Sequence, residues 1–378
     1  MRRKAKYVIV AYIFIISDSP GVLNGQNLYT LLCAGRSSKH VSVKKQRRNG
    51  EKMIFKCRNC GGNVVYSPEK KSMYCPHCEG IESQQKMEGT SEETCANCGA
   101  PLHAGTFSSS ARCEHCGNYI VFDKKVQGEY EPNLILPFKI GKEGAKEILK
   151  REFKKRAFTP ASFLSEATLD KMEGAYVPFW LYDYIAQYHY AGEGTKVRSW
   201  RSGDKEYTET SYYRVIRELN IDFDKIPVDA SIAMDDGIMD LMEPYEYKDL
   251  EGFQDKYISG FLSEFFNEDA EKLEPRAKRK AQSDAEALLQ ESLSGYSTLR
   301  AQHKQLNMDR LGFFYALLPV WVYTYSYRDQ KFPFYVNGQT GKVIGKTPMS
   351  MQKLAGYSAT VFAITFLIVN FLFMICKL

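Results

Sequence analysis

Apolar residues are concentrated near the C-terminus of this chain, in a stretch long enough to cross a membrane. No charged residue occurs among the 23 positions from Leu354 to Cys376. A helix of that length spans about 34 Å, and the hydrocarbon core of a bilayer is about 30 Å thick. A buried core helix would carry a polar face, but Asn370 is the one strongly polar side chain in the apolar half. The pattern predicts a transmembrane helix over residues 354–376.

The charges that flank this stretch predict its orientation. Lys342, Lys346 and Lys353 precede it, whereas Lys377 alone follows. Positive residues accumulate on the cytoplasmic side of a membrane segment. We therefore expect a single-pass protein of the cell membrane, with the bulk of the chain in the cytoplasm.

Residues 130–348 alternate between helical and strand patterns, which predicts an α+β domain with a mixed antiparallel sheet and helices. Its aromatic-rich sheet, with Trp180 and Trp321, is a candidate surface for a peptide or another subunit. The expected elements are helices over 142–156 and 160–173, strands over 175–190 and 207–219, an acidic and mostly helical region over 230–293 with Pro227, Pro244 and Pro275 as breakers, and further strands after Gly295.

Two strand segments of this domain echo each other. Val177-Pro-Phe-Trp-Leu-Tyr182 matches Leu318-Pro-Val-Trp-Val-Tyr323. Either the strand unit is duplicated, or the two segments are alike because both meet the same local requirements of an aromatic edge strand. Pro178 and Pro319 cannot donate to a ladder, so each predicts an edge, a bulge or a strand start. After the second copy, Asn337-Gly338 predicts a hairpin turn with positive φ.

Eight cysteines follow one repeated spacing ahead of the domain. Each half holds two Cys-x2-Cys pairs separated by fourteen residues, and glycines follow the pairs where the chain must turn. Two zinc ribbons are predicted, over 53–84 and 85–125, joined by a flexible connector over 79–94. The expected ligands of two Zn²⁺ ions per chain are Cys57, Cys60, Cys75 and Cys78 in the first ribbon, and Cys95, Cys98, Cys113 and Cys116 in the second.

Disulfide bonds and bound iron are the alternatives to zinc for these cysteines. Disulfides need an oxidising compartment and are disfavoured, whereas iron in place of zinc stays open. His77 and His115 occupy equivalent places between paired cysteines, and His103 has no partner, so none is expected to be a ligand. Four thiolates leave no coordination position for water, which predicts structural rather than catalytic metal; a sensing role stays open.

The first 52 residues differ in charge from the rest. They carry 11 Lys and Arg and 2 acids, so the net charge of +6 for the whole chain becomes −3 beyond them. The basic start followed by Tyr7–Ile16 imitates a signal peptide. We expect residues 1–52 to be a disordered leader or to precede the true initiator, for which Met53 is the candidate.

These features together resemble a known bacterial family. The tandem ribbons, Leu136-Pro-Phe138, Val177-Pro-Phe-Trp-Leu181, Tyr207-Thr-Glu-Thr210, Ile226-Pro-Val-Asp-Ala-Ser231, Met234-Asp-Asp236, Leu318-Pro-Val-Trp321 and Asn337-Gly-Gln-Thr-Gly-Lys342 are similar to the TFIIB-type zinc-ribbon-containing membrane proteins. The resemblance covers residues 54–376, and some members carry a primosomal replication helicase label. It implies zinc binding and a membrane location, and no established reaction.

The residues do not support a helicase or another enzyme. Gly345-Lys346-Thr347 matches the end of the phosphate-loop motif Gly-x4-Gly-Lys-Ser/Thr, but Thr340 occupies the position of its first glycine. We therefore expect this segment to be the end of a strand and a juxtamembrane linker. Asp235-Asp236, or Glu206, Glu209 and His189 on a sheet, are weak candidates for a cation or catalytic cluster. Cys33 and Cys376 lack the partners of a nucleophilic site.

Nucleic-acid binding is the alternative to a protein-binding role. Binding to phosphates needs excess positive charge, yet the ribbon region carries eight bases and eight acids. The bases are Lys56, Arg58, Lys70, Lys71, Lys86, Arg112, Lys124 and Lys125, and the acids are Glu69, Glu79, Glu82, Glu88, Glu92, Glu93, Glu114 and Asp123. The sequence therefore favours a non-enzymatic, zinc-binding, membrane-anchored adaptor that binds a protein, over a zinc-ribbon protein of transcription or replication.

Overall fold

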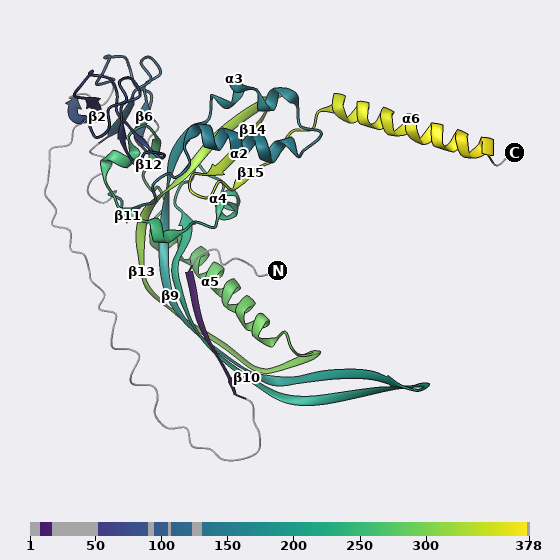
Figure 1. The fold of residues 1–378 in the computed structure, drawn as a ribbon. Coiled ribbons are helices and arrows are strands. Elements are labelled where there is room, and N and C mark those ends of the chain that lie inside the picture. Colours follow the sequence, from purple (N-terminus) through teal and green to yellow (C-terminus); the bar gives the residue numbers. More distant parts are fainter. Residues whose placement is uncertain (1–7, 17–51, 90–93, 105–106, 123–130, 376–378) are drawn as a thin grey trace.

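A computed structural model describes residues 8–16, 52–89, 94–104, 107–122 and 131–375. Two cysteine clusters come first, a body of mixed sheet and helices follows, and an apolar helix ends the described residues (Figure 1). The body is built on one large curved sheet that continues into the second cysteine-rich segment. The predicted α+β fold class is confirmed.

Three long strands form the centre of this sheet. They are β9 (Glu173–Ser202), β10 (Lys205–Asp229) and β13 (Thr298–Tyr327). β9 lies between the other two and pairs antiparallel with both. The sequence places β9 and β10 correctly but makes them too short. The missed end of β9 (191–202) is mostly polar, so no clear alternation marks it. The missed end of β10 (220–229) does alternate between buried and exposed residues, but it contains Pro227, which was expected to act as a breaker.

Shorter strands extend the sheet on both sides. In the body, β8 and β12 pair with β13 and β9, β11 pairs with β8, and β14 joins β13 to β15. In the cysteine-rich segment, β2 pairs with β5 and β7, β6 pairs with β7 and β12, and β3 and β4 form a small sheet of their own. Their bounds are Lys52–Cys57 for β2, Val65–Ser67 for β3, Ser72–Tyr74 for β4, Gln84–Gly89 for β5, Ser108–Arg112 for β6, Tyr119–Phe122 for β7, Leu134–Ile135 for β8, Glu251–Gly252 for β11, Leu262–Glu264 for β12, Gln330–Asn337 for β14 and Val343–Gly345 for β15.

Two strands, β5 and β1 (Val8–Ile16), form in segments that were not expected to have regular structure. β5 pairs with β2 along its whole length, inside the segment expected to be a flexible connector. β1 pairs with residues 216–224 of β10, inside the segment expected to be disordered. Its β-branched residues favour an extended strand, and the edge of β10 offers unpaired backbone groups. Residues 1–7 and 17–51 lie outside the described residues.

The helices also depart from the prediction in part. α2 (Lys142–Lys154) lies where a helix was expected, but the expected helix over 160–173 is a 3₁₀ helix (Ala161–Leu164) and the four-residue α3 (Glu166–Leu169). The region 230–293 holds α4 (Asp236–Met242) and α5 (Ala270–Leu293), with two short 3₁₀ helices (Tyr247–Asp249 and Asp255–Ile258) and two strands between them. Pro275 lies inside α5 rather than breaking it, because buried small residues at helical spacing hold that helix on the sheet.

β9 and β13 are related by a pseudo-two-fold axis. Val177 and Leu318, the first residues of the two echoed motifs, pair with each other, and they stand 141 positions apart in the chain. β12 pairs parallel with β9 at Ala175, and β8 pairs parallel with β13 at its counterpart Ala316. The strand order β8-β13-β9-β12 is therefore symmetric about the axis.

The same relation extends to the helices. The Trp180 indole donates to the Glu268 carbonyl at 2.8 Å, and the Trp321 indole donates to the Ile140 carbonyl at 2.9 Å. Each acceptor stands two residues before a helix, α5 in the first case and α2 in the second. Both tryptophans are thus buried anchors for helices, which corrects the expectation that they line a binding surface.

The prolines of the two motifs lie inside strands. At Pro178 the outer neighbour of β9 changes from β12 to β10, and at Pro319 the neighbour of β13 changes from β8 to β14. A residue at such a junction needs no N–H donor on that side. The carbonyls still accept, from Ala230 for Pro178 and from Gly338 for Pro319, both at 2.9 Å.

The last hairpin forms as predicted but turns differently. Positive φ falls on Gly341 (+75°) rather than on Gly338. A Cβ on Gly338 would lie 2.5 Å from the Phe138 ring, so this glycine is needed for close packing. The buried Asn337 side chain accepts from the N–H groups of Gln339 and Thr340 and closes the turn.

The C-terminal helix α6 (Met351–Ile375) projects away from the body (Figure 1). Residues Met351–Leu372 are long and apolar enough to cross a membrane, with mean hydropathy 1.7, and none of that span is buried. β15 ends at Gly345 and α6 begins six residues later, so Gly345-Lys346-Thr347 forms a strand end and linker as expected.

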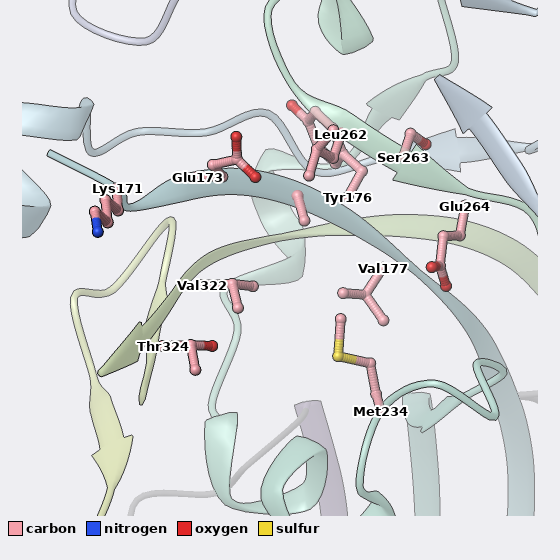
Figure 2. Close-up of a pocket in the computed structure, with 11 residues that line it drawn as sticks. Lys171, Glu173, Tyr176, Val177, Met234, Leu262, Ser263, Glu264, Val322 and Thr324 are labelled. Carbon is pink, nitrogen blue, oxygen red and sulfur yellow. The ribbon is translucent and has the colours of Figure 1, made fainter. Parts of the chain in front are cut away.

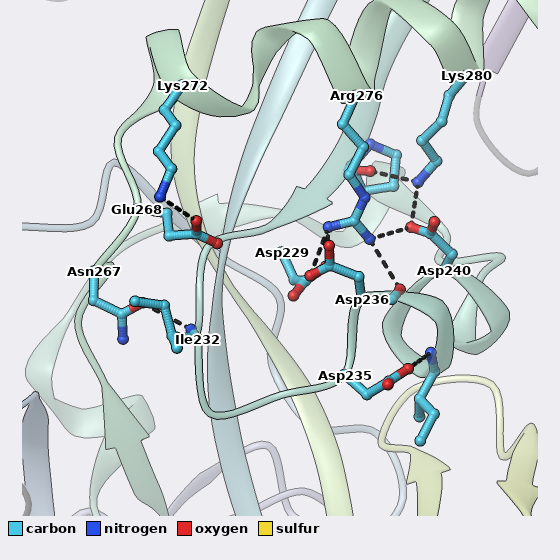
Figure 3. Close-up of polar contacts among 12 residues, drawn as sticks. Asp229, Ile232, Asp235, Asp236, Asp240, Asn267, Glu268, Lys272, Arg276 and Lys280 are labelled. Atoms are coloured by element: carbon cyan, nitrogen blue, oxygen red, sulfur yellow. Dashed lines mark hydrogen bonds and ion pairs between the residues drawn. The ribbon is translucent and has the colours of Figure 1, made fainter.

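A buried ion network holds α5 against β10 and α4 (Figure 3). Arg276 of α5 pairs with Asp229 at 2.8 Å and with Asp240 at 2.8 Å, and Lys280 pairs with Asp240 at 3.0 Å and with Glu243. Burial raises the pKa of Asp229 to about 6, and the Arg276 guanidinium opposes the rise. The ionised carboxylate therefore depends on its arginine.

Replacing Arg276 with Ala should destabilise the body strongly. Removal of one partner from a buried ion pair costs about 3–5 kcal/mol, which corresponds to a drop in melting temperature on the order of 10 °C. Without the guanidinium, burial raises the pKa of Asp229 further. The loss relative to wild type should therefore be larger at about pH 8, where the carboxylate is charged, than at about pH 5. Thermal unfolding at both pH values measures this.

Lys272→Ala on the same helix is the matched control. Lys272 pairs with Glu268 at 2.8 Å in an exposed position, so its removal should leave the melting temperature unchanged. Equal losses in both variants would show that the Arg276 network does not hold α5 in place.

Candidate metal centres

Four tight turns present the cysteines. In each turn the first cysteine's carbonyl accepts from the residue four positions later, and its N–H donates to the carbonyl five positions later. The fourth residue after each first cysteine has positive φ, at Gly61 (+72°), Glu79 (+61°), Gly99 (+72°) and Gly117 (+71°). Glycine at three of these positions meets the backbone requirement that the sequence indicated.

Each pair of turns brings four sulfur atoms together. The Sγ atoms of Cys57 and Cys78 lie 3.5 Å apart, as do those of Cys60 and Cys75. The corresponding pairs of the second cluster are Cys95 with Cys116 at 3.6 Å and Cys98 with Cys113 at 3.8 Å. All ligand atoms within each cluster lie within 4.8 Å of one another.

These distances fit a tetrahedral metal and not disulfides. A disulfide joins two sulfurs at about 2.05 Å, and all eight cysteines are free. Four thiolates about 2.3 Å from a tetrahedral ion stand about 3.8 Å from one another. Each cluster can therefore hold one metal ion, which gives two sites within the described residues, and four thiolates leave no coordination position open.

The electrostatics of the first cluster favour a bound cation. The Ser83 hydroxyl hydrogen-bonds the Cys57 sulfur at 3.1 Å and lowers the pKa of this thiol to about 6. The Gly80 N–H lowers the pKa of Cys78, but the Cys60 and Cys57 thiols outweigh it and raise this pKa to about 12. Four sulfurs at this separation become anions together only if a cation balances their charge.

The second cluster has the same asymmetry. Burial raises the pKa of Cys116, but hydrogen bonds from the Asn97 side chain, the Asn118 N–H and the neighbouring thiols together outweigh it, and the pKa falls to about 6. The Ala100 N–H lowers the pKa of Cys98, but burial and the Cys116 thiol raise it to about 12. Each cluster therefore has one thiol prepared to ionise and one that ionises only beside a cation.

Sequence reasoning missed the residues around the ligands. Lys56 donates to Asn97 at 2.6 Å and to Asn63 at 2.8 Å, so it links the turns of the two clusters. Ser83 and Asn97 contact ligand sulfurs from outside the coordination set. The contact of Asn97 could have been suspected from the sequence, because a polar residue lies there between two paired cysteines. Nothing in the sequence pattern indicates the contact of Ser83. His77, His103 and His115 are exposed and belong to neither cluster.

Both clusters are docked on the body through one segment, residues 257–264. The Ser259 hydroxyl donates to the Val64 carbonyl at 2.9 Å, and the Tyr66 ring packs edge-on against Tyr257. In the second cluster β6 pairs with β12, and the Ser109 hydroxyl donates to Ser263 at 2.9 Å. The clusters are thus fixed parts of the fold.

The other candidates from the sequence have structural roles. Asp235 caps α4 by accepting from the Ile238 N–H at 2.9 Å, and Asp236 pairs with Arg276 at 3.1 Å. Glu206 and Glu209 stand opposite arginines near the end of β10, whereas His189 lies beside Glu218, far from both. The structure therefore does not bring His189, Glu206 and Glu209 together. Cys33 and Cys376 lie outside the described residues.

One surface depression of about 420 Å³ lies where β9, β12 and β13 meet (Figure 2). Val177, Met234 and Val322 form its floor, and two carboxylates lie at its edge. Glu173 is paired with Arg112 at 3.3 Å and Glu264 accepts from Ser231 at 2.9 Å. Both acids therefore have partners, and among the described residues the depression is not one of the groups of side chains able to hold a metal ion.

A comparison with known proteins relates most of the chain to another protein. The sequence is 34% identical over 325 residues to a Bacillus subtilis (strain 168) protein described as uncharacterized protein YdjG, covering 83% of this chain and 95% of that one. The chain belongs to the same family as YdjG. A match over this share of both chains extends well beyond the cysteine motifs. No family model matches the chain, and no solved structure does.

Replacing one cysteine per cluster should remove one metal ion each. Cys57→Ser and Cys113→Ser each leave three sulfurs, which should reduce the bound metal from about two ions to about one per chain. The matched controls are His77→Ala and His115→Ala, which should keep both ions because these exposed side chains lie outside the clusters. Elemental analysis of the purified chain measures the content. Loss of an ion from a histidine variant would show that the ligand set is different.

Proposed function

We propose that this chain is a zinc-binding protein held in the cell membrane by α6, with its body in the cytoplasm. We further propose that it acts as an adaptor for a protein partner and not as an enzyme. The observation that carries the proposal is α6 itself, an apolar helix whose membrane-length span has no buried residue.

An exposed apolar helix of this length is costly in water. Phe362, Phe366 and Leu367 are each more than half exposed, so the helix presents large side chains on its surface. Such a surface marks contact with a membrane or a partner, and a length of 22 residues matches the hydrocarbon core. The lysines before α6 outnumber those after it, which supports a cytoplasmic body.

The metal that we propose is zinc. Closed four-cysteine sites in tight turns are typical of structural zinc, and a reducing cytoplasm keeps the thiols available. The resemblance to TFIIB-type zinc-ribbon membrane proteins supports the same metal. Since each site has its four ligands in place, we assign it to holding the ribbons in shape.

An adaptor role is supported by how the ribbons are presented. They lie at one end of the body, away from α6 (Figure 1), where they contact residues 257–264. Their bases and acids are equal in number, which favours a protein surface over a phosphate backbone as partner. The missing glycine in the phosphate-loop segment argues against nucleotide hydrolysis.

Membrane anchoring is tested by placing charge in the middle of α6. Wild-type chain should stay with the membrane fraction after alkaline carbonate extraction. Ile364→Arg combined with Leu367→Arg should release the chain, because each arginine at mid-bilayer costs about 2.5–3.5 kcal/mol on insertion scales. Asn370→Leu, which makes the helix more apolar, is the control and should remain bound. Release of the wild type by carbonate would rule out a spanning anchor.

The partner class is tested by purifying the full chain from membranes in mild detergent. We expect about two zinc ions per chain and a specific protein that survives nuclease treatment. Enriched nucleic acid, lost as salt is raised, would instead indicate the transcription or replication alternative. If the elemental analysis finds iron instead, the two four-cysteine sites stand but the bound metal is iron and not zinc.

A further inference from the structure

The far end of the β9–β10 hairpin extends beyond the rest of the sheet. Beyond Thr195 of β9 the pairing with β13 has ended, and residues 196–211 form a two-stranded ribbon, which we name the arm tip. Figure 1 shows it at the end of a long curved arm. Isolated two-stranded hairpins are marginal in water, so an extension of this kind calls for a contact.

One face of the arm tip continues the sheet face that α5 covers. Tyr188 is on that face of β9 and donates to Glu286 of α5. α5 ends at Leu293, and Tyr296 packs against Gly194 just beyond it. Because side chains alternate along a strand, the same face of the arm tip carries Lys196, Arg198 and Trp200 from β9, with Lys205, Tyr207 and Glu209 from β10.

This face combines exposed aromatic rings with positive charge. Trp200 and Tyr207 stack at a centroid distance of 5.7 Å and are 44% and 43% exposed. The Arg198 guanidinium lies 5.8 Å from the Trp200 ring centre. Three bases accompany one acid, Glu209, which stands opposite Arg198.

We propose that the arm tip is a second membrane contact, which places Trp200 and Tyr207 in the headgroup layer of a bilayer with anionic lipids. Tryptophan and tyrosine favour this layer because they join an apolar ring to a polar group, and lysine and arginine favour anionic headgroups. The inference rests on the proposed anchoring by α6, which would hold a bilayer beside the body. In Figure 1 the arm tip and α6 extend from the body toward the same side of the view.

A lipid surface fits this face better than a single-stranded nucleic acid. Bases bind proteins by stacking on free aromatic faces. Here Trp200 and Tyr207 stack on each other, with Arg198 beside Trp200. Both rings remain partly exposed and the basic side chains of this face are exposed, which suits the headgroup layer.

The chain offers its own fluorescent probe for this contact. It has three tryptophans, and Trp180 and Trp321 are buried in the body at 8% and 5% exposure, so Trp200 alone is open to lipid. The full chain would be reconstituted into phosphatidylcholine and phosphatidylglycerol vesicles, with and without brominated acyl chains. We expect bromolipid to quench the emission by up to about a third, the share of one tryptophan in three.

Matched variants assign the signal. Trp200→Phe should abolish the quenching and leave the melting temperature unchanged. Val197→Ser, on the opposite face of the arm tip, should keep it. Lys196→Gln combined with Lys205→Gln should reduce the quenching in vesicles with phosphatidylglycerol and not in vesicles of phosphatidylcholine alone.

The outcomes separate this inference from the proposed anchoring. If the chain floats with vesicles but bromolipid leaves Trp200 unquenched, the arm-tip contact is refuted and the anchor stands. If the Trp200 emission instead responds only to added single-stranded nucleic acid, the arm tip is a nucleic-acid surface and the inference is overturned. A chain that does not float with vesicles refutes the anchor, and the arm-tip contact falls with it.

Discussion

The antiparallel pair of β9 and β13 around Val177 and Leu318 positions most of the molecule. Each strand carries a proline where its outer neighbour changes and a tryptophan that fixes the start of a helix on the sheet. A parallel short strand then lies on each side of the pair. This arrangement satisfies both indole N–H groups inside a buried aromatic core, where an unpaired donor would be costly. The cysteine clusters, the arm and α6 are all attached to the frame that results.

The metal clusters depend on this frame as well as on their own turns. Local hydrogen bonds and positive φ bring each set of four sulfurs together, and these requirements are encoded within a few residues. The orientation of the clusters depends on residues 257–264, which belong to the body and reach the clusters through Ser259 and β12. If the body were misfolded, the cysteine turns could still form locally, but the two metal sites would no longer be positioned against the sheet.

The parts that could be predicted from the sequence are those that short-range rules determine. The cysteine spacing and the placement of glycines were sufficient to predict that the eight cysteines form two clusters. The length and composition of the C-terminal segment were sufficient to predict the helix α6. Long-range partners decide the rest. Trp180 and Trp321 looked like surface aromatics because the carbonyls that satisfy them lie 88 and 181 residues away in the chain. The turn at Gly338 was placed wrongly because its crowding by Phe138 comes from across the fold. The extra length of β9 was missed because its end is mostly polar, and that of β10 was missed because Pro227 was taken as a breaker although the strand continues through it.

The shared core of the first cluster and the body gives metal supply a wider effect. Met53, Val64 and Met73 belong to the same buried cluster as the aromatic centre of the sheet, together with the ligands Cys57 and Cys75. A metal that binds only the folded chain stabilises it by about 4 kcal/mol when its free concentration is a thousand times the dissociation constant. The free concentration of the bound metal thus contributes to the folding equilibrium of the body as well as of the cluster, and with it to how long the protein survives proteolysis.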